Sequence, residues 1–513
     1  MIENSSKSLR AIYLALTNIC VMFYILSLSI GDISADEIRV AVPQLPVFKG
    51  VPYGRPFGGN PEAFTIPAIF EGLTYIDAGG KVQPLLATSW IQLSGNQWRF
   101  KLREGVRFSN GQYFNSETVR NNLSFVFEER SAAYSVVQQL AHISHIEILD
   151  SHTIDIFSSR PNPFMPQLMS IFYIVEPEQW KELGSSGFAH EPVGTGPFKV
   201  SNWLDTVINL EQSDLSWRSP ETKRLKIMSI PNPTSRLQGI LAGDLEVAFS
   251  MGPDDRSIIE SRGHNMMVRA TPGVITMPFN LVRVSPLQDI RVRQALNHAV
   301  DNTTIIKAIL GPDAVAPIQF TSHMAYGFDP SYAPYPYDIE RARALMAEAG
   351  FSDGFDLPVE IAQGLSSYSS SIYQLVATYL AKIDVNMEIR PVPISRYMEV
   401  LMGGEWKETL AINLDYAVDP TLDALVPIER HSCFGAIAWY CDQDMTQLLV
   451  MAQNSGDLVD RMDLTRRVVR QQTEQAPGLL LWEKLRFDAI ASQVHGFTHD
   501  LNFVHYDKLV IRR

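Results

Sequence analysis

Alternating and helical patterns of apolar positions follow one another along most of the chain. Residues 98–102 alternate between apolar and polar side chains, which predicts a half-buried strand. Residues 289–300 carry apolar side chains at helical spacing, and Asp338 can cap a further helix that Gly350 ends. Strand-like and helix-like segments that alternate in this way are typical of α/β proteins, so we predict an α/β fold.

Shorter signals extend the same pattern. Residues 38–42 and 245–248 are expected to form strands, and a helix over residues 235–241 is expected to end at Gly243. Ser116 is suited to cap a helix that begins near it. No period of 20 to 50 residues repeats, which argues against a solenoid.

The first residues have the features of a secretory signal. Lys7 and Arg10 precede a long apolar run over residues 11–30, and small Ala35 stands just before polar residues. A basic start, an apolar stretch and a small residue at the cut predict export, with cleavage after Ala35. The apolar run is long for a signal, so an uncleaved anchor helix is the alternative.

The location follows from the same segment. Bulky Ile19 stands before Cys20 where a lipid-attachment site has a small residue, so a lipoprotein is not expected. No second apolar run of membrane-spanning length occurs in the sequence. We therefore expect a periplasmic protein.

Composition excludes some partners. The chain has 513 residues, of which 46% are hydrophobic and 10% aromatic, so extensive disorder is excluded. Its 43 basic and 56 acidic side chains give a formal net charge of −13, and no basic stripe interrupts them. Nucleic acid is therefore not expected as a partner.

Two cysteines remain after the predicted cleavage. Cys433 and Cys441 lie eight positions apart, and in an oxidising compartment they are expected to form a local disulfide. Two unrelated buried thiols are the alternative. A metal site is not expected, because His431 is the one histidine nearby and the spacing fits no zinc pattern.

Catalytic motifs are absent from the sequence. It contains no Gly-x-Ser-x-Gly, no His-Glu-x-x-His and no Gly-x-x-x-x-Gly-Lys. His142 and His145 are three positions apart and could share one solvated helix face, a weak signal for a metal. We therefore expect no enzyme activity, metal or cofactor.

Several longer segments, in order, resemble one known family. They are residues 71–73, 84–90, 100–111, 114–119, 192–198, 280–281, 289–301 and 342–355. The most specific is residues 100–111, Phe-Lys-Leu-Arg-Glu-Gly-Val-Arg-Phe-Ser-Asn-Gly. Together they resemble the family 5 extracellular solute-binding proteins of bacterial ABC importers, a group with dipeptide-, oligopeptide-, nickel-, glutathione- and opine-binding members.

The resemblance implies a two-lobed periplasmic binding protein fold (type II, or cluster C) with an extra subdomain inserted in lobe I. After the signal, residues 1–35, it places lobe I in residues 36–75, 200–283 and 495–513. The inserted subdomain takes residues 76–199, and lobe II takes residues 284–494. The lobes of such proteins close around a ligand by a hinge motion.

The resemblance also suggests an anchor for the ligand. Asp419, in the segment Leu-Asp-Tyr-Ala-Val-Asp-Pro, matches the aspartate that pairs with the α-ammonium group in peptide-binding members. A fixed carboxylate in a closed site suits a desolvated ammonium. The alternative is that Asp419 organises the turn before Pro420. Dipeptide-binding relatives carry a disulfide shortly after this aspartate, where Cys433 and Cys441 stand here, although the loop here is shorter.

One segment departs from the family. Where dipeptide binders have an arginine for the ligand's carboxylate, residues 363–371 contain none, so strict dipeptide binding is not expected. Ser367 and Tyr368 would suit hydroxyl-rich or amide ligands there, and a polar loop is the equal alternative. The remaining candidate contacts are Tyr416, Arg396, Tyr397 and Trp439 in lobe II and Gly58 in lobe I.

The predicted function is therefore solute capture for import. The chain would act as a monomer and deliver a peptide, opine or related small solute to ABC permease subunits in the inner membrane. An extracytoplasmic enzyme on the same fold and a receptor that presents its ligand to a chemosensor are the alternatives.

Overall fold

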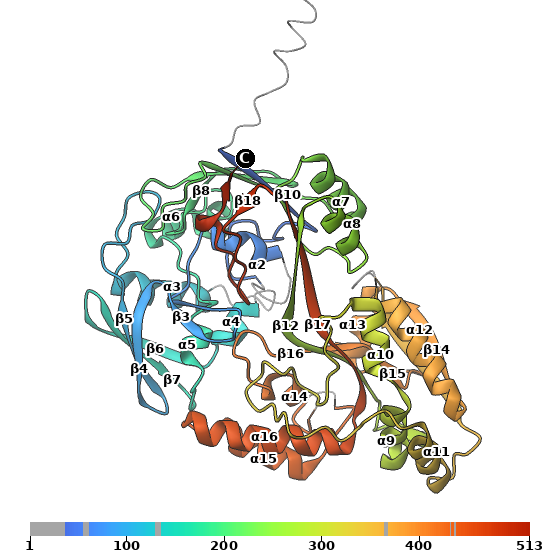
Figure 1. Cartoon of the computed structure of the whole chain (residues 1–513). Coiled ribbons are helices and arrows are strands. Elements are labelled where there is room, and N and C mark those ends of the chain that lie inside the picture. The colour runs from blue at the N-terminus through green and yellow to red at the C-terminus, as the bar shows by residue number, and fades with distance from the viewer. Residues whose placement is uncertain are drawn as a thin grey trace, which may run out of the picture.

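The structure, a computed structural model, describes residues 36–54, 61–128, 135–363, 368–430, 432–435 and 438–512. The predicted signal and the predicted contacts Gly58 and Ser367 lie outside these residues. Helices and strands alternate along the chain, which confirms the predicted α/β class (Figure 1).

A long mixed sheet forms the centre of lobe I, and its edge strand β16 comes from the segment predicted as lobe II. Its strands follow the order β16-β12-β17-β11-β1-β10-β9-β8, and β1 pairs in parallel with both β10 and β11. The strands are β1 (Glu37–Val42), β8 (Phe198–Trp203), β9 (Val207–Gln212), β10 (Arg224–Ser229), β11 (Val247–Ala248), β12 (Asn265–Pro278), β16 (Leu414–Ala417) and β17 (Gly478–Ile490). Its helices are α2 (Pro61–Thr65), α7 (Pro233–Ala242) and α8 (Asp255–Ser261).

The longest strands of this sheet connect the two lobes. β12 and β17 pair in an antiparallel manner from Asn265 and Ile490 at one end to Pro278 and Gly478 at the other. Figure 1 shows both strands running from the upper half of the molecule into the lower half. We call β12 and β17 the hinge strands.

A second sheet lies beside lobe I. It has the order β4-β5-β7-β6, and all of its strands fall within residues 76–199, the predicted insertion. Its strands are β4 (Ala87–Ser94), β5 (Gln97–Leu102), β6 (Ile143–Asp150) and β7 (Thr153–Ser158), and a hairpin of β2 (Thr74–Ile76) and β3 (Val82–Pro84) precedes it. Its helices are α3 (Ser116–Glu128), α4 (Ser135–Leu140), α5 (Met165–Leu168) and α6 (Pro177–Phe188).

Lobe II is built around a parallel sheet of order β14-β13-β15. Its strands are β13 (Phe355–Ala362), β14 (Val385–Val392) and β15 (Ala411–Ile412). Its helices are α9 (Ile290–Ala299), α10 (Asn302–Leu310), α11 (Ile339–Glu348), α12 (Ser369–Leu380), α13 (Ile394–Gly403), α14 (Leu425–Arg430), α15 (Gln443–Gln453) and α16 (Leu458–Gln475). The chain then returns to lobe I and forms β18 (Val494–His495) and β19 (Val510–Ile511).

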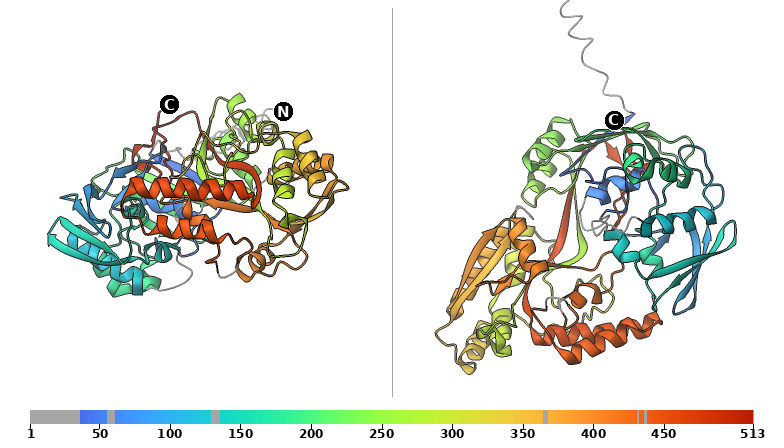
Figure 2. Two further views of the ribbon diagram at one scale, coloured as in Figure 1. Left: turned by 90° about the horizontal axis from the view of Figure 1, so that it is seen from below. Right: turned by 180° about the vertical axis from the view of Figure 1, so that it is seen from behind.

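The three parts are distinct in space. Figure 2 shows the inserted sheet and the α9–α13 group on opposite sides of the hinge strands, with α15 and α16 along one edge. The apolar cores largely follow this division, because one core combines lobe I with the insertion and two others consist mainly of lobe II residues, although Ile76 and Leu501 also join one of these two. The boundaries drawn from the sequence remain a prediction.

Several helix ends were predicted correctly from local capping residues. The side chains of Asp289 and Asp338 accept hydrogen bonds from the first turns of α9 and α11. Gly243 ends α7 in the left-handed conformation, with φ of 76°. These ends are decided by a few neighbouring residues, so the sequence pattern is enough to place them.

Two local predictions were wrong. The cap of α3 is Asn115, whose Oδ1 accepts a hydrogen bond from Thr118 N at 3.1 Å, rather than Ser116. His142 and His145 do not share a helix, because β6 begins between them at Ile143 and pairs with β7. The spacing of two histidines could not reveal this pairing.

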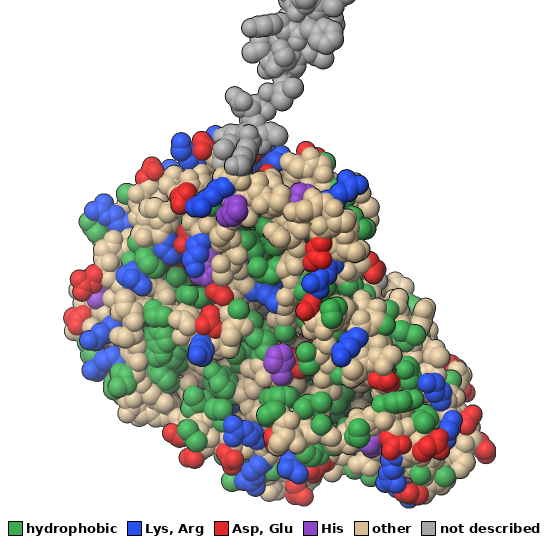
Figure 3. Space-filling model, viewed as in Figure 1, with side chains coloured by type: hydrophobic (Ala, Val, Ile, Leu, Met, Phe, Trp, Pro, Cys, Tyr) green, Lys and Arg blue, Asp and Glu red, His purple; other side chains and the backbone are tan. Residues whose placement is uncertain are grey.

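The surface carries charges of both signs. On the face shown in Figure 3, Lys and Arg side chains are interspersed with Asp and Glu rather than gathered in one area. Among the described residues, no helix has the length and apolar character needed to cross a membrane.

Candidate ligand-binding site at the hinge

The hinge strands carry charged side chains on one face. Arg269 of β12 lies directly opposite Arg486 of β17, and Met267 lies opposite Asp488. Because side chains alternate along a strand, Arg269, Arg486 and Asp488 share a face of the ribbon. Arg486 and Asp488 are almost completely buried. Charged groups in such a place need partners, since burying a charge is costly.

Arg486 and Asp488 are joined through a histidine. Arg486 Nη1 lies 2.7 Å from His499 Nε2, and His499 Nδ1 lies 3.1 Å from Asp488 Oδ2. Because a guanidinium can only donate, we assign Nε2 as the acceptor and place the ring proton on Nδ1, which donates to Asp488. Burial, with the charges of Arg486 and Arg269, lowers the pKa of His499 well below its usual value. His499 is therefore neutral at physiological pH.

Burial also acts on the charged members of this cluster. Burial lowers the pKa of Arg486, against the opposing effects of Asp488 and Asp419. Burial raises the pKa of Asp488, although both arginines oppose the shift. Ser250 N donates a further hydrogen bond to Asp488 Oδ1 at 3.3 Å. The cluster therefore contains buried cations and anions, and each charge is stabilised by the opposite charges beside it.

Asp419 approaches this cluster from lobe II. It follows β16, the strand that pairs with β12, and Val418 N donates to Pro272 O at 2.9 Å. The Asp419–Pro420 peptide bond is cis, and Asp419 is 7% exposed. Its carboxylate is close enough to Arg486 to favour the charged guanidinium. Asp419 thus lies where lobe II meets the hinge strands.

Three of the predicted aromatic contacts lie together in one core of lobe II. Tyr397, Tyr416 and Trp439 are buried in the same cluster as Val418. Tyr397 donates its hydroxyl proton to Asn413 O at 2.8 Å, and Trp439 meets the Trp406 ring edge-on at 5.2 Å. These contacts support the segment that carries Asp419.

Tyr416 and Tyr368 have different surroundings. The Tyr416 ring lies 6.2 Å from that of Phe320, and burial raises the pKa of Tyr416. Tyr368 is half-buried beside Trp482 of β17, at 6.4 Å between rings. Burial, with a smaller effect of Asp415, raises the pKa of Tyr368 to about 12. Tyr368 is thus the predicted aromatic contact that packs directly on a hinge strand.

Arg396 is held within lobe II. Its Nε lies 3.0 Å from Glu360 Oε2, and its Nη2 donates to Glu405 O at 2.8 Å. Thr409 donates to the other Glu360 oxygen at 2.7 Å. These partners account for the position of Arg396 inside the lobe, so we do not carry it into the proposed site.

The predicted cysteine pair is present as a disulfide. Cys433 and Cys441 are joined through their Sγ atoms, in the segment between α14 and α15. The residues after Cys433 lead to Trp439 and Tyr440, which lie in the same core as Val418. The disulfide therefore ties a surface loop to the support of Asp419.

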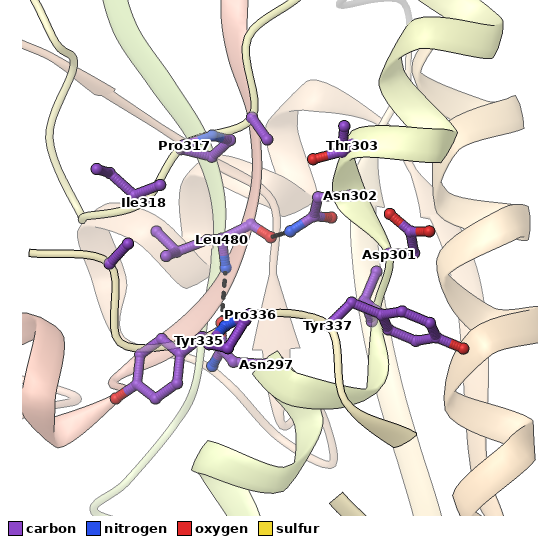
Figure 4. Close-up of a pocket in the computed structure, with 13 residues that line it drawn as sticks. Asn297, Asp301, Asn302, Thr303, Pro317, Ile318, Tyr335, Pro336, Tyr337 and Leu480 are labelled. Carbon is purple, nitrogen blue, oxygen red and sulfur yellow. Dashed lines mark hydrogen bonds between the residues drawn. The ribbon is translucent and has the colours of Figure 1, made fainter. Parts of the chain in front are cut away.

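A separate pocket lies inside lobe II. Its volume is ≈ 180 Å³, and Figure 4 shows the residues that line it. Asn302 donates to Leu480 O at 2.7 Å, and Leu480 N donates to Asn297 Oδ1 at 3.2 Å. These hydrogen bonds hold β17 against α9 and α10, so Asn297 and Asn302 have a structural role in this pocket. Within the described ranges, no group of three or more His, Cys, Asp or Glu side chains could hold a metal ion.

The lobes touch on both sides of the hinge strands. Gln92 of the insertion donates to Gly456 O at 2.8 Å, and Gln167 donates to Tyr326 OH at 3.2 Å. On the other side, Arg256 of α8 pairs with Asp313 at 2.5 Å. These contacts join the two lobes directly, in addition to the hinge strands.

The geometry defines a class of protein: two lobes on shared strands, with buried charges where they meet, form a receptor that encloses its ligand. The family model for bacterial extracellular solute-binding proteins, family 5, matches residues 81–420. This chain belongs to that family, whose members bind solutes, and the resemblance found in its sequence is confirmed.

Individual relatives extend the match to most of the chain. The dipeptide-binding protein of Escherichia coli K12 is 23% identical over 89% of this chain and 93% of its own. A dipeptide-binding protein of Pseudoalteromonas sp. SM9913, solved with Met-Leu, is 21% identical with a TM-score of 0.76. NikA of Brucella suis, solved with Fe(III)-EDTA, is 21% identical with a TM-score of 0.77. Each structure covers 93% of this chain and 100% of its own, so the two-lobed fold is shown.

Sequence analysis missed the hinge cluster. Arg486 and Asp488 stand two positions apart in the second half of β17, between apolar residues, which was a signal that charged side chains share one buried face. Arg269 stands alone in another largely apolar strand. Their meeting depends on the pairing of distant strands, which no local pattern reveals.

A second ion pair on β17 gives a pH prediction. His323 Nδ1 contacts the buried carboxylate of Glu483, and His323 N donates to the same carboxylate at 3.1 Å. This contact raises the pKa of His323. The pair therefore stabilises the fold fully below the unfolded pKa of about 6.5 and loses this effect as pH rises through the higher folded value.

We expect His323→Gln to destabilise the protein more at pH 5.5 than at pH 9. The side chain is 41% exposed, so solvent screening limits the difference to about 1 kcal/mol or less. Urea unfolding at both pH values measures it, with exposed His145→Gln as the control. A larger loss at pH 9 than at pH 5.5 would contradict the assignment.

Proposed function

We propose that this protein captures a small polar solute that carries an ammonium group, such as a peptide or an opine, and delivers it to an ABC importer. The chain is exported by its N-terminal signal, works in the periplasm as a monomer, and presents the closed, loaded form to the permease. The family membership and the two-lobed fold support this role.

The observation that carries the proposal is the position of Asp419. A carboxylate that is 7% exposed, at the junction of lobe II and the hinge strands, is suited to hold a cation away from water. A charge-assisted hydrogen bond is stronger there than in bulk solvent. Asp419 therefore anchors the ammonium group of the solute.

Capture follows from the hinge. A ligand that contacts groups of both lobes binds the closed state better than the open state, so it shifts the equilibrium toward closure. Contacts such as Gln92 with Gly456 and Arg256 with Asp313 then form on either side of the hinge. Closure supplies the signal that the permease recognises.

We expect Asp419→Asn to weaken binding of the solute by about 2–4 kcal/mol, because the amide leaves a buried ammonium without its charge partner. Small molecules that co-purify with the native protein are identified by mass spectrometry, and calorimetry compares their affinity for both proteins. Asp356→Asn is the matched control, since Asp356 is exposed on β13 and its loss should not change affinity.

Three measurements separate this proposal from its alternatives: affinity, conversion of the solute, and uptake by cells. Equal affinity of the Asp419→Asn variant and the native protein would exclude Asp419 as the anchor. Conversion of the solute into product during incubation would favour an enzyme. Unimpaired uptake in a strain that lacks the protein would exclude its role in import.

A further inference from the structure

Arg269 is a buried cation whose guanidinium group lacks hydrogen bonds. Its Nε, Nη1 and Nη2 are shielded from solvent, and none has a hydrogen-bond partner among the described residues. Arg293 shows the usual arrangement, because its Nε donates to Gln475 O at 2.9 Å and its Nη1 to Leu287 O at 2.8 Å. Arg269 is therefore placed for a partner that the described part of the chain does not supply.

The acidic groups around Arg269 are already engaged. Asp488 and Asp500 both act on its charge. Asp488 contacts His499 and accepts from Ser250 N, as described above. Asp500 Oδ2 lies 2.7 Å from His505 Nε2, and Asp500 Oδ1 accepts from Ala78 N at 3.0 Å. Asp488 and Asp500 therefore partly offset the free-energy cost of burying the Arg269 charge, but neither accepts a hydrogen bond from its guanidinium group.

The arrangement costs free energy in two ways. Arg269 and Arg486 are like charges directly opposite each other on paired strands, which is unfavourable. Five donor hydrogens of Arg269 have also lost water without gaining acceptors. Burial, with the charge of Arg486, lowers the pKa of Arg269 to about 10, so it stays protonated at neutral pH. An anion that accepts from Arg269 would relieve both costs.

We propose that Arg269 is the anion subsite of this binding protein and receives a carboxylate of the solute, while Asp419 holds its ammonium. The assignment rests on the proposed function and adds that the solute is zwitterionic. The planar fork of a guanidinium fits a carboxylate through two parallel hydrogen bonds. The subsite takes the place of the arginine that residues 363–371 do not contain.

The location of Arg269 gives this subsite a role in closure. Arg269 lies on a hinge strand, whereas Asp419 comes from lobe II, next to Arg486. A zwitterion held at both ends links the hinge strand to lobe II. A carboxylate that enters in the open state is enclosed when the lobes meet, where low local polarity strengthens both charge pairs.

The first test compares acids with their amides. Free dipeptides, opines and glutathione are screened by calorimetry, and each binder is repeated with its carboxylate converted to a carboxamide. We expect the native protein to prefer the acid by at least about 100-fold. Arg269→Gln should lose this preference by weakening the acid alone, and Arg269→Lys should recover part of it. Arg390→Gln, on the exposed face of β14, is the control.

The second test needs no ligand. Arg269→Met should raise the Tm of the ligand-free protein by about 2 °C, because a buried unpaired charge is removed. Arg293→Met should lower the Tm, because carbonyl groups lose their donor. A fall in Tm for Arg269→Met as large as that for Arg293→Met would show a structural role and overturn the subsite.

The outcomes separate the two proposals. If binders show equal affinity as acid and amide, or Arg269→Gln keeps the preference for the acid, the subsite is wrong while solute capture stands. If no member of the panel binds and nothing co-purifies, the proposed solute class is wrong. The Tm comparison of Arg269→Met with Arg293→Met then decides the role of Arg269 by itself.

Discussion

Replacing Glu71 with alanine will lower the free energy of unfolding by about 3–5 kcal/mol, the usual loss when one member of a buried ion pair is removed. Glu71 is fully buried. Its Oε1 lies 2.7 Å from Arg218 Nε, and its Oε2 accepts from Thr195 at 2.7 Å and from Trp217 Nε1 at 3.0 Å. Without Glu71, the half-buried Arg218 would keep Asp507 alone as its ion-pair partner.

The Glu71 network holds distant segments of lobe I together. Thr195 lies at the end of the insertion, Arg218 lies after β9, and Asp507 lies near the C-terminus. Urea unfolding followed by circular dichroism measures the effect. Glu117→Ala is the control, because its side chain is 56% exposed and it pairs with Arg120 on the surface of α3. A loss below about 1 kcal/mol for Glu71→Ala would show that the network contributes little.

Replacing Gly354 with alanine will also destabilise the protein strongly, by about 3–5 kcal/mol, because strain and overlap add. Gly354 has a φ of +69°, where an L side chain is strained. A Cβ atom there would lie 1.6 Å from Asp384 O, a backbone atom that cannot rotate away. The turn before β13 and the start of β14 would have to separate.

Gly350 provides a matched control for this substitution. Its φ is +83°, but a Cβ atom there would meet nothing within 4 Å. Gly350→Ala should therefore cost about 1 kcal/mol, the strain alone. Thermal unfolding of both variants separates the overlap from the strain. Equal losses in the two variants would mean that the β13–β14 contact adapts without cost.

Both substitutions fall in segments that resemble the family, which clarifies what those segments do. Glu71 joins segments of lobe I through Thr195, Trp217 and Arg218, and Gly354 allows the close approach of Asp384 in lobe II. The segments that identify the family therefore specify the fold. The residues that we propose for recognition of the solute, Asp419 and Arg269, lie outside these segments.

Sequence reasoning placed local elements well. The caps at Asp289 and Asp338 and the end of α7 at Gly243 depend on hydrogen bonds within a few residues. The alternation at residues 98–102 corresponds to β5. The cap of α3 is Asn115 and not the predicted Ser116, because neighbouring polar side chains compete for the same backbone donors.

Long-range contacts were not predictable in the same way. The ion pair of Arg396 with Glu360, a residue of another element, could not be foreseen from the sequence, and a ligand role for Arg396 stays a prediction. The spacing of His142 and His145 would have allowed a shared helix face, but β6 begins between them and pairs with β7. Ligand roles at Gly58 and Ser367 stay predictions, since both lie outside the described residues.

By itself, the sequence determined the α/β class, the family and the cysteine pair, because these depend on short local patterns and on their order along the chain. The acidic anchor at Asp419 stays a prediction. The tertiary structure decided which charges meet at the hinge. Arg269 and Arg486 face each other because two long strands pair in one register, and a shift of one residue would turn these side chains to opposite faces. That register depends on the pairing of two distant strands, and it brings Arg269, the anion subsite that we propose, to the hinge.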